Sequence, residues 1–228
     1  MRRRAIHRLA AFTIVEMLAV VFIIGVLMSI IVPSLANVRR ESLSVACQAN
    51  LRQLNAAIDA YRSTIKGALP MCDFLPAATP DGPVGGLVEV LGGMIEKDCK
   101  CWYCAGDVDL EGSIAAGTSY IYLPGLLRYS PQVQIQVAGL MFASQGDSLT
   151  ERQRVRRRHE AEAKIVGSLY ERSPMEFAVL MDSQDRHTIG SRNPRNAAYI
   201  DGSVTILRDT GDQAKDTESI FDQGAPTP

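Results

Sequence analysis

The first 36 residues constrain this chain most, because they carry an apolar stretch long enough to cross a lipid bilayer. Residues 9–36 contain one charged side chain, that of Glu16, among 28 positions. A membrane-spanning helix needs only about 20 residues. Arginines precede the stretch at positions 2, 3, 4 and 8, and the positive-inside rule keeps such a flank in the cytoplasm. We therefore expect a single-pass membrane protein whose N-terminus is cytoplasmic and whose remaining chain is extracytoplasmic.

The apolar stretch is typical of a retained anchor rather than of a secretory signal. A secretory signal has a shorter apolar core, followed by small residues at a cleavage site. Here the apolar run of residues 17–32 leads directly into helix-forming sequence. The segment should therefore stay with the protein.

Glu16 is the residue of the stretch that apolar character does not explain. A charged side chain at the centre of a membrane helix costs about 3 kcal/mol, and such residues usually mark a functional site. The alternative is a position near the membrane face, where the carboxylate reaches water.

The residues around Glu16 resemble the class III signal of type IV prepilins over residues 11–18, AFTIVEML. In that family a prepilin peptidase cuts just before a Phe that is followed by Thr, two aliphatic residues and Glu. The resemblance implies cleavage between Ala11 and Phe12, N-methylation of Phe12, and an assembly role in which Glu16 pairs with the terminal amine of an adjacent subunit. The family usually has Gly where this chain has Ala11. Pro33 stands where the family places a proline, and because it lacks an amide hydrogen it should kink or loosen the helix.

An amphipathic helix follows the anchor. Apolar residues recur there every three or four positions, which predicts one buried stripe: Cys47, Leu51, Leu54, Ile58, Tyr61 and Ile65. Gly67 and Pro70 then provide a stop signal. We expect a leader at residues 1–11, a transmembrane helix at 12–36 and its amphipathic continuation at 37–67.

Residues 68–228 are expected to form a globular head of loops and short antiparallel strands. The stretch 76–93 is rich in turn-forming residues. Alternating or apolar runs predict strands at residues 120–123, 132–137, 177–181 and 197–207. Asp201-Gly202 divides the last run and predicts a hairpin. These patterns predict an α+β fold class with a small antiparallel sheet. The resemblance to type IV prepilins implies that the fold is pilin-like, with a long N-terminal helix packed on that sheet.

The end of the predicted sheet carries a second resemblance. Residues 195–204, RNAAYIDGSV, are similar to the ending of a large group of bacterial prepilin-like proteins. Many of these carry a histidine ten positions before the Asp-Gly aspartate. Here that position is Ser191, and His187 lies four residues earlier, so a role that depends on the histidine is not carried over.

The chain has five cysteines, and an extracytoplasmic head favours disulfides. The loop cysteines leave three alternatives open, a structural disulfide, a four-thiolate zinc site or free thiols: Cys72, Cys99, Cys101 and Cys104. Their spacing is not the paired C-x-x-C repeat of zinc ribbons. An odd count leaves at least one cysteine without an intramolecular partner. We expect it to be Cys47, because the helix stripe would bury it.

The charged run at residues 151–164 predicts a solvated helix, because acids follow arginines at a spacing of four: Arg156 with Glu160, and Arg158 with Glu162. Contact of Arg152–Arg158 with nucleic-acid phosphates is the alternative. No aromatic side chain interleaves these arginines to stack on bases, and loss of residues 1–11 would leave a net charge near −5, so we do not expect a nucleic-acid partner. The acids Asp201, Asp209 and Asp212 match no calcium motif, and no metal ligand is predicted from them.

No catalytic constellation is visible in the sequence. The three histidines have no evident nucleophile partner, and no G-x-S-x-G, H-E-x-x-H or phosphate-binding loop is present, so we expect neither an enzyme nor a cofactor. The resemblance implies a structural subunit of a type IV pilus or a type II secretion pseudopilus in the bacterial inner membrane. Its partners would be other pilin or pseudopilin subunits, prepilin peptidase and an inner-membrane assembly platform. The alternative is an anchored extracytoplasmic domain that binds a ligand, DNA or metal and does not polymerise.

Overall fold

The computed structural model describes residues 13–79, 82–143, 149–172, 174, 177–184, 186–187 and 195–207. Ala11, Phe12, Ser191, Asp209 and Asp212 lie outside these ranges. The described residues form an α+β fold with a long N-terminal helix and a small antiparallel sheet, which confirms the predicted fold class. The chain divides into two units, Met1–Arg39 and Arg40–Pro228.

Helix α1 (Ile14–Thr64) is 51 residues long and extends from the first unit into the second. It ends close to the predicted stop, because Gly67 adopts a φ of 83° and its amide donates to the carbonyl of Arg62 at 2.8 Å. A positive φ suits glycine, which has no Cβ to clash.

In the first unit, α1 is apolar and exposed all round. Every side chain that the structure describes between residues 14 and 39 is exposed, and the backbone stays helical through Pro33. This part of α1 is long and apolar enough to cross a membrane by length and composition.

In the second unit, α1 buries the predicted stripe. Cys47, Leu51, Leu54 and Ile58 are at most 1% exposed. Tyr61 is half-buried, whereas Ile65 lies beyond the end of the helix and is exposed. The prediction is therefore confirmed for the stripe from Cys47 to Ile58.

The sheet of the head has the strand order β3-β4-β5-β6 with antiparallel pairing throughout. Its strands are β3 (Tyr120–Tyr122), β4 (Ala178–Asp182), β5 (Arg195–Tyr199) and β6 (Val204–Leu207). Asp201-Gly202 forms the predicted hairpin turn, in which Gly202 has a φ of 88° and Ala198 pairs with Val204. A separate ribbon, β1 (Ala77–Thr79) with β2 (Gly82–Val84), lies within the turn-rich stretch.

The strand predicted at residues 132–137 is wrong, because these residues belong to helix α5 (Pro131–Ala143). The alternating sequence suits a strand only if alternate apolar residues share a buried face. Here Val133 and Val137, four residues apart, are buried, while Ile135 between them is 71% exposed. The Ser130 hydroxyl caps the helix by accepting from the amide of Val133 at 3.3 Å, and proline is favoured at the first helical position.

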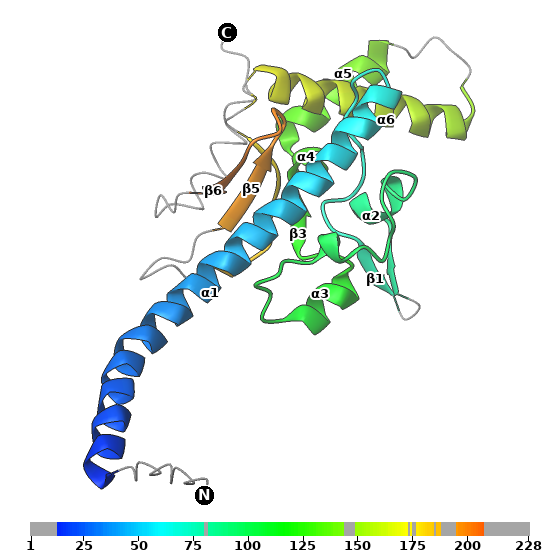
Figure 1. The fold of residues 1–228 in the computed structure, drawn as a ribbon. Coiled ribbons are helices and arrows are strands. Elements are labelled where there is room, and N and C mark those ends of the chain that lie inside the picture. Colours follow the sequence, from blue (N-terminus) through cyan, green and yellow to red (C-terminus); the bar gives the residue numbers. More distant parts are fainter. Residues whose placement is uncertain are drawn as a thin grey trace, which may run out of the picture. The chain divides into compact units, whose positions relative to one another are not determined.

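The charged run forms helix α6 (Glu151–Arg172), as predicted, and lies beside α5 (Figure 1). Its solvation is only partial, because Glu162, Ile165, Val166 and Tyr170 are buried. The remaining helices are short: α2 (Gly86–Val90), the 3-10 turn η1 (Lys100–Trp102), α3 (Leu110–Ala116) and α4 (Leu123–Leu127).

Candidate functional site

Glu16 lies in the first turn of α1 and is hydrogen-bonded to its own helix. The Thr13 amide and hydroxyl each donate to Oε2 of Glu16 at 2.9 Å, and the Glu16 amide donates to the Thr13 hydroxyl at 3.3 Å. This arrangement is a capping box, in which Thr and Glu three residues apart satisfy free amides at the start of a helix. The Thr-x-x-Glu spacing is visible in the sequence, but the two predictions for Glu16, a partner in another subunit or a position near the membrane face, do not include a helix cap.

Of the three alternatives for the loop cysteines, the structure contains a disulfide, but it includes only two of the four. Cys99 and Cys101 are joined by a disulfide, while Cys47, Cys72 and Cys104 are free and buried. The four loop cysteines therefore do not form a four-thiolate site in this structure. Cys47 is free, as predicted.

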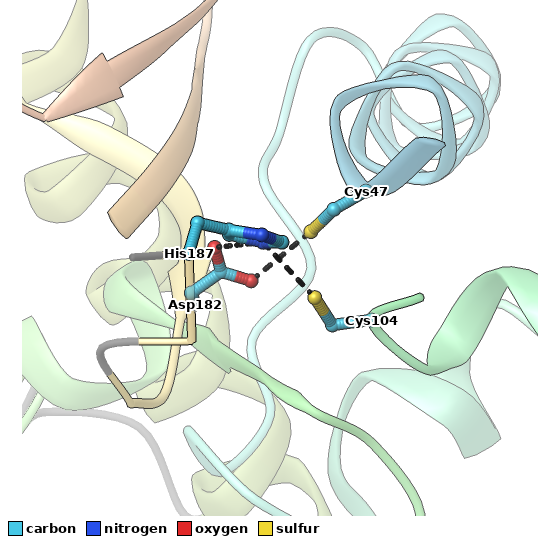
Figure 2. Close-up of side chains that lie close together, drawn as sticks. All are labelled: Cys47, Cys104, Asp182 and His187. Atoms are coloured by element: carbon cyan, nitrogen blue, oxygen red, sulfur yellow. Dashed lines mark hydrogen bonds and ion pairs between the residues drawn. The ribbon is translucent and has the colours of Figure 1, made fainter. Parts of the chain in front are cut away.

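Two of the free cysteines lie in a buried cluster with an aspartate and a histidine (Figure 2). The cluster consists of Cys47, Cys104, Asp182 and His187, and one ligand atom from each lies within 4.8 Å of all the others. Cys47 comes from the middle of α1, Cys104 from the loop after η1, Asp182 from the end of β4, and His187 from the segment that follows β4. We call these four residues the Cys-Asp-His cluster.

Three close contacts connect the cluster. The Cys47 thiol donates to Oδ1 of Asp182 at 3.2 Å, and Sγ of Cys104 lies 3.2 Å from Nε2 of His187. The same Nε2 atom lies 3.5 Å from Oδ2 of Asp182. All four side chains point toward one centre, as Figure 2 shows.

The electrostatics of the cluster favour a thiolate. The neighbouring Cys47 thiol lowers the pKa of Cys104 to about 6, and His187 acts in the same direction against the effect of burial. Cys104, burial and the charge of Asp182 raise the pKa of Cys47. Burial lowers the pKa of His187, but Asp182 and Cys104 raise it to about 9. The thiolate is the form of cysteine that binds metals and acts as a nucleophile.

Neighbouring groups hold the carboxylate of the cluster in place. The backbone amide of Asn196 donates to Oδ2 of Asp182 at 2.8 Å. The side-chain oxygen of Asn196 accepts from Ser44 at 3.3 Å and from Gln48 at 3.1 Å. Ser44 and Gln48 lie on one face of α1 beside Cys47, since residues three and four apart are neighbours on a helix surface. That face of the helix is thereby bonded to the sheet beside the cluster.

The loops that carry Cys104 and His187 are joined by a buried ion pair. Nε of Arg186 lies 3.0 Å from Oδ1 of Asp107, and both side chains are 1% exposed. Between Cys104 and Asp107, Gly106 passes directly under the histidine ring, where an added Cβ would come within 2.8 Å of Cε1 of His187. The ring therefore has little freedom to turn away from the cluster.

The cluster does not have the geometry of a nucleophile–histidine–acid triad. In a triad the acid binds one ring nitrogen and the nucleophile the other, whereas Cys104 and Asp182 both face Nε2 of His187. Cys47 and Cys104 are also at most 3% exposed, so a substrate would not reach them. Two sulfurs, one imidazole nitrogen and one carboxylate oxygen are instead donors that a metal ion such as Zn²⁺ accepts.

Two further residues of the predicted sites, Arg158 and Asp201, have structural partners. Arg158 of the basic run donates to Glu162 at 3.2 Å and to Gln134 at 2.8 Å, and thereby links α6 to α5. Asp201 accepts from the amide and hydroxyl of Ser203 at 2.9 and 2.7 Å, which is ordinary turn chemistry.

Comparison of the chain with protein-family models, with curated proteins and with solved structures gave no match.

Proposed function

We propose that this chain is a structural subunit of a type IV pilus or a type II secretion pseudopilus, anchored in the bacterial inner membrane. The observation that carries the proposal is the change in character along α1. Its first part is apolar and exposed on all sides, with one acid in the first turn. Its second part buries a single stripe in the head.

The exposed part of α1 needs a cover. A helix that is apolar all round belongs in a membrane or in the interior of an assembly. Lipid would provide that cover for the single subunit, and the same helices of neighbouring subunits would provide it after extraction into a fibre. Other pilin or pseudopilin subunits and an inner-membrane assembly platform are accordingly the partners. The N-terminus would be cytoplasmic and the head extracytoplasmic.

Glu16 would have two successive roles in this scheme. In the single subunit it caps α1 through Thr13, and these hydrogen bonds engage Oε2. In a fibre, Oε1 would accept from the methylated amine of Phe12 of an adjacent subunit. Burial of that pair suits a low dielectric, because each charge neutralises the other. The carboxylate thus serves both the helix end and the subunit contact.

Processing of the leader tests the proposal. Full-length protein is produced in a bacterial host that contains a prepilin peptidase, extracted from membranes and analysed by intact-mass and N-terminal peptide mass spectrometry. We expect loss of residues 1–11 and a methyl group on Phe12. The control is the same chain in a host without the peptidase, which should retain the leader.

A leader that stays intact in both hosts would support the alternative, an anchored domain that does not polymerise. A cut beyond Pro33 would indicate a secreted protein. Either result would overturn the proposed function.

A further inference from the structure

We propose that the Cys-Asp-His cluster is a structural zinc site, in which Cys47, Cys104, Asp182 and His187 bind one Zn²⁺ ion. The first argument is the donor set. Structural zinc sites are almost always four-coordinate and tetrahedral, with sulfur, imidazole nitrogen and carboxylate oxygen as ligands. The cluster supplies four such donors, one from each side chain.

The second argument is the spacing of the donors. Zinc–sulfur bonds of about 2.3 Å and zinc–nitrogen bonds of about 2.0 Å place the ligands of a tetrahedron roughly 3.3–3.8 Å apart. The three measured contacts are 3.2, 3.2 and 3.5 Å, and no pair of donor atoms exceeds 4.8 Å. Shifts of a few tenths of an ångström to about 1 Å would therefore seat the ion, with no rearrangement of the four segments.

The third argument is charge. Asp182 is 0% exposed, and burial of a carboxylate is costly unless a cation compensates it. A divalent ion at the centre of the cluster would compensate the buried carboxylate, which lies within 4.8 Å of the other three donor atoms. Such an ion binds cysteine as the thiolate and histidine as the neutral imidazole.

The surroundings of the cluster match those of metal ligands. Groups outside the ligand set orient the ligands of protein metal sites and tune their basicity. Here the hydroxyl of Tyr120 lies 3.3 Å from Sγ of Cys47, and the amide of Asn196 donates to Asp182. Gly106 confines the ring of His187. Each of these three ligands is therefore held in place before an ion arrives.

A closed site defines the role of the ion. Four protein ligands leave no open coordination position, and all four residues are buried, so the ion would stabilise the head rather than perform catalysis. It would join α1, the loop after η1 and the end of β4. A disulfide between Cys47 and Cys104 is the competing arrangement. It would use two of the donors and would give no reason for a buried Asp182 and His187 at the same centre.

The test uses the full-length protein in detergent micelles, purified under reducing conditions and stripped with a chelator. Zn²⁺ is then titrated against a chromophoric chelator, and Co²⁺ is added to a second sample as a spectroscopic probe. We expect one ion per chain, together with a thiolate-to-cobalt charge-transfer band and the intense visible bands of a tetrahedral site. X-ray absorption of the zinc-loaded wild type should show two sulfur and two nitrogen or oxygen neighbours.

Two cysteine variants make the test specific. Cys104→Ser removes a ligand, and we expect its zinc affinity to fall by about 100-fold or more, since loss of a group that only supports a ligand already costs roughly 10–100-fold. Cys72→Ser is the matched control, because Cys72 is also free and buried but lies outside the cluster. Its affinity should equal that of the wild type. If Cys104→Ser does not fold, the cobalt and X-ray absorption spectra of the wild type decide the question.

Three results would overturn the zinc site. One is a wild type that binds no Zn²⁺ after reduction, and the second is equal affinity in Cys104→Ser and the wild type. The third is a Cys47–Cys104 disulfide in non-reducing peptide maps of protein isolated from cells. The zinc site does not depend on leader processing, so its failure would leave the proposed function in place.

Discussion

The two parts of α1 belong to one helix and yet meet opposite surroundings. From residue 14 to 39 the described apolar side chains all face outward. From residue 40 onward the apolar side chains of Cys47, Leu51, Leu54 and Ile58 face the core of the head, while Asp59 and Arg62 form an ion pair near the surface.

The comparison teaches that the placement of polar residues, rather than apolar content, assigns each part of the helix to its surroundings. Polar residues at regular intervals leave one apolar stripe, which a sheet can cover. Where such residues are missing, as in residues 14–39, the helix has no polar face for water, and all its sides must be covered by lipid or by other helices. The same helical backbone is therefore apolar on all sides at one end, as the proposed anchor requires, and a core element at the other.

Leu51→Ala should give the largest difference in unfolding free energy between a substitution in the second part of α1 and one in the first part. Leu51 is 0% exposed, and truncation of a buried leucine costs about 2–5 kcal/mol of unfolding free energy. The measurement is denaturant unfolding of the full-length protein in micelles, followed by near-ultraviolet circular dichroism of the head.

Leu18→Ala is the matched control in the anchor, where the side chain is 66% exposed. Exposed substitutions usually change stability by less than about 0.5 kcal/mol. Asp59→Asn controls for the exposed face of the second part, since a surface ion pair contributes about 0.3–0.5 kcal/mol. Equal losses in Leu51→Ala and Leu18→Ala would show that the two parts do not differ in burial.

Leu27→Asp tests whether the first part of α1 is inserted in the membrane. An aspartate at the centre of a membrane helix costs about 2.5–3.5 kcal/mol, so we expect a marked loss of protein from carbonate-washed membranes. Val45→Asp is the control, because Val45 is just as exposed, at 56% against 53% for Leu27, but lies in the second unit. If both variants stay in the membrane fraction, residues 14–39 are not the anchor.

Most of the fold follows from local sequence signals. The stripe on α1, the stop at Gly67 and the Asp201-Gly202 hairpin depend on neighbouring residues. The structure confirms the stripe from Cys47 to Ile58, the stop and the hairpin. The strand prediction at residues 132–137 is wrong because alternation of glutamine with apolar residues also places Val133 and Val137 on one helical face. Only the capping residues before them, Ser130 and Pro131, distinguish the helix from a strand.

The Cys-Asp-His cluster could not be predicted by the same means. Its members lie on four segments between positions 47 and 187, and only the folded chain brings them together. The sequence correctly predicts that Cys47 is free and buried, but its position on the stripe indicates only a core residue. Spacing groups Cys104 with its neighbours in sequence, and the prepilin-like pattern gives His187 no role because its position does not fit.

Substitution of Glu16 tests the central claim, assembly through a charged pair in the anchor, most directly. Glu16→Gln keeps the capping box, because glutamine serves at that position as glutamate does, but it removes the charge. Glu16→Ala removes both, and Thr13→Val weakens only the cap, at a cost of about 1 kcal/mol. The measurement is the amount of each protein in sheared fibres relative to the amount in membranes.

If Glu16 pairs with a neighbouring amine, its loss strands a buried charge at a cost of about 3–5 kcal/mol. We therefore expect Glu16→Gln and Glu16→Ala to insert normally and to be nearly absent from fibres, while Thr13→Val assembles close to the wild-type level. Fibre incorporation of Glu16→Gln at the wild-type level would contradict the claim and leave Glu16 as a helix cap alone.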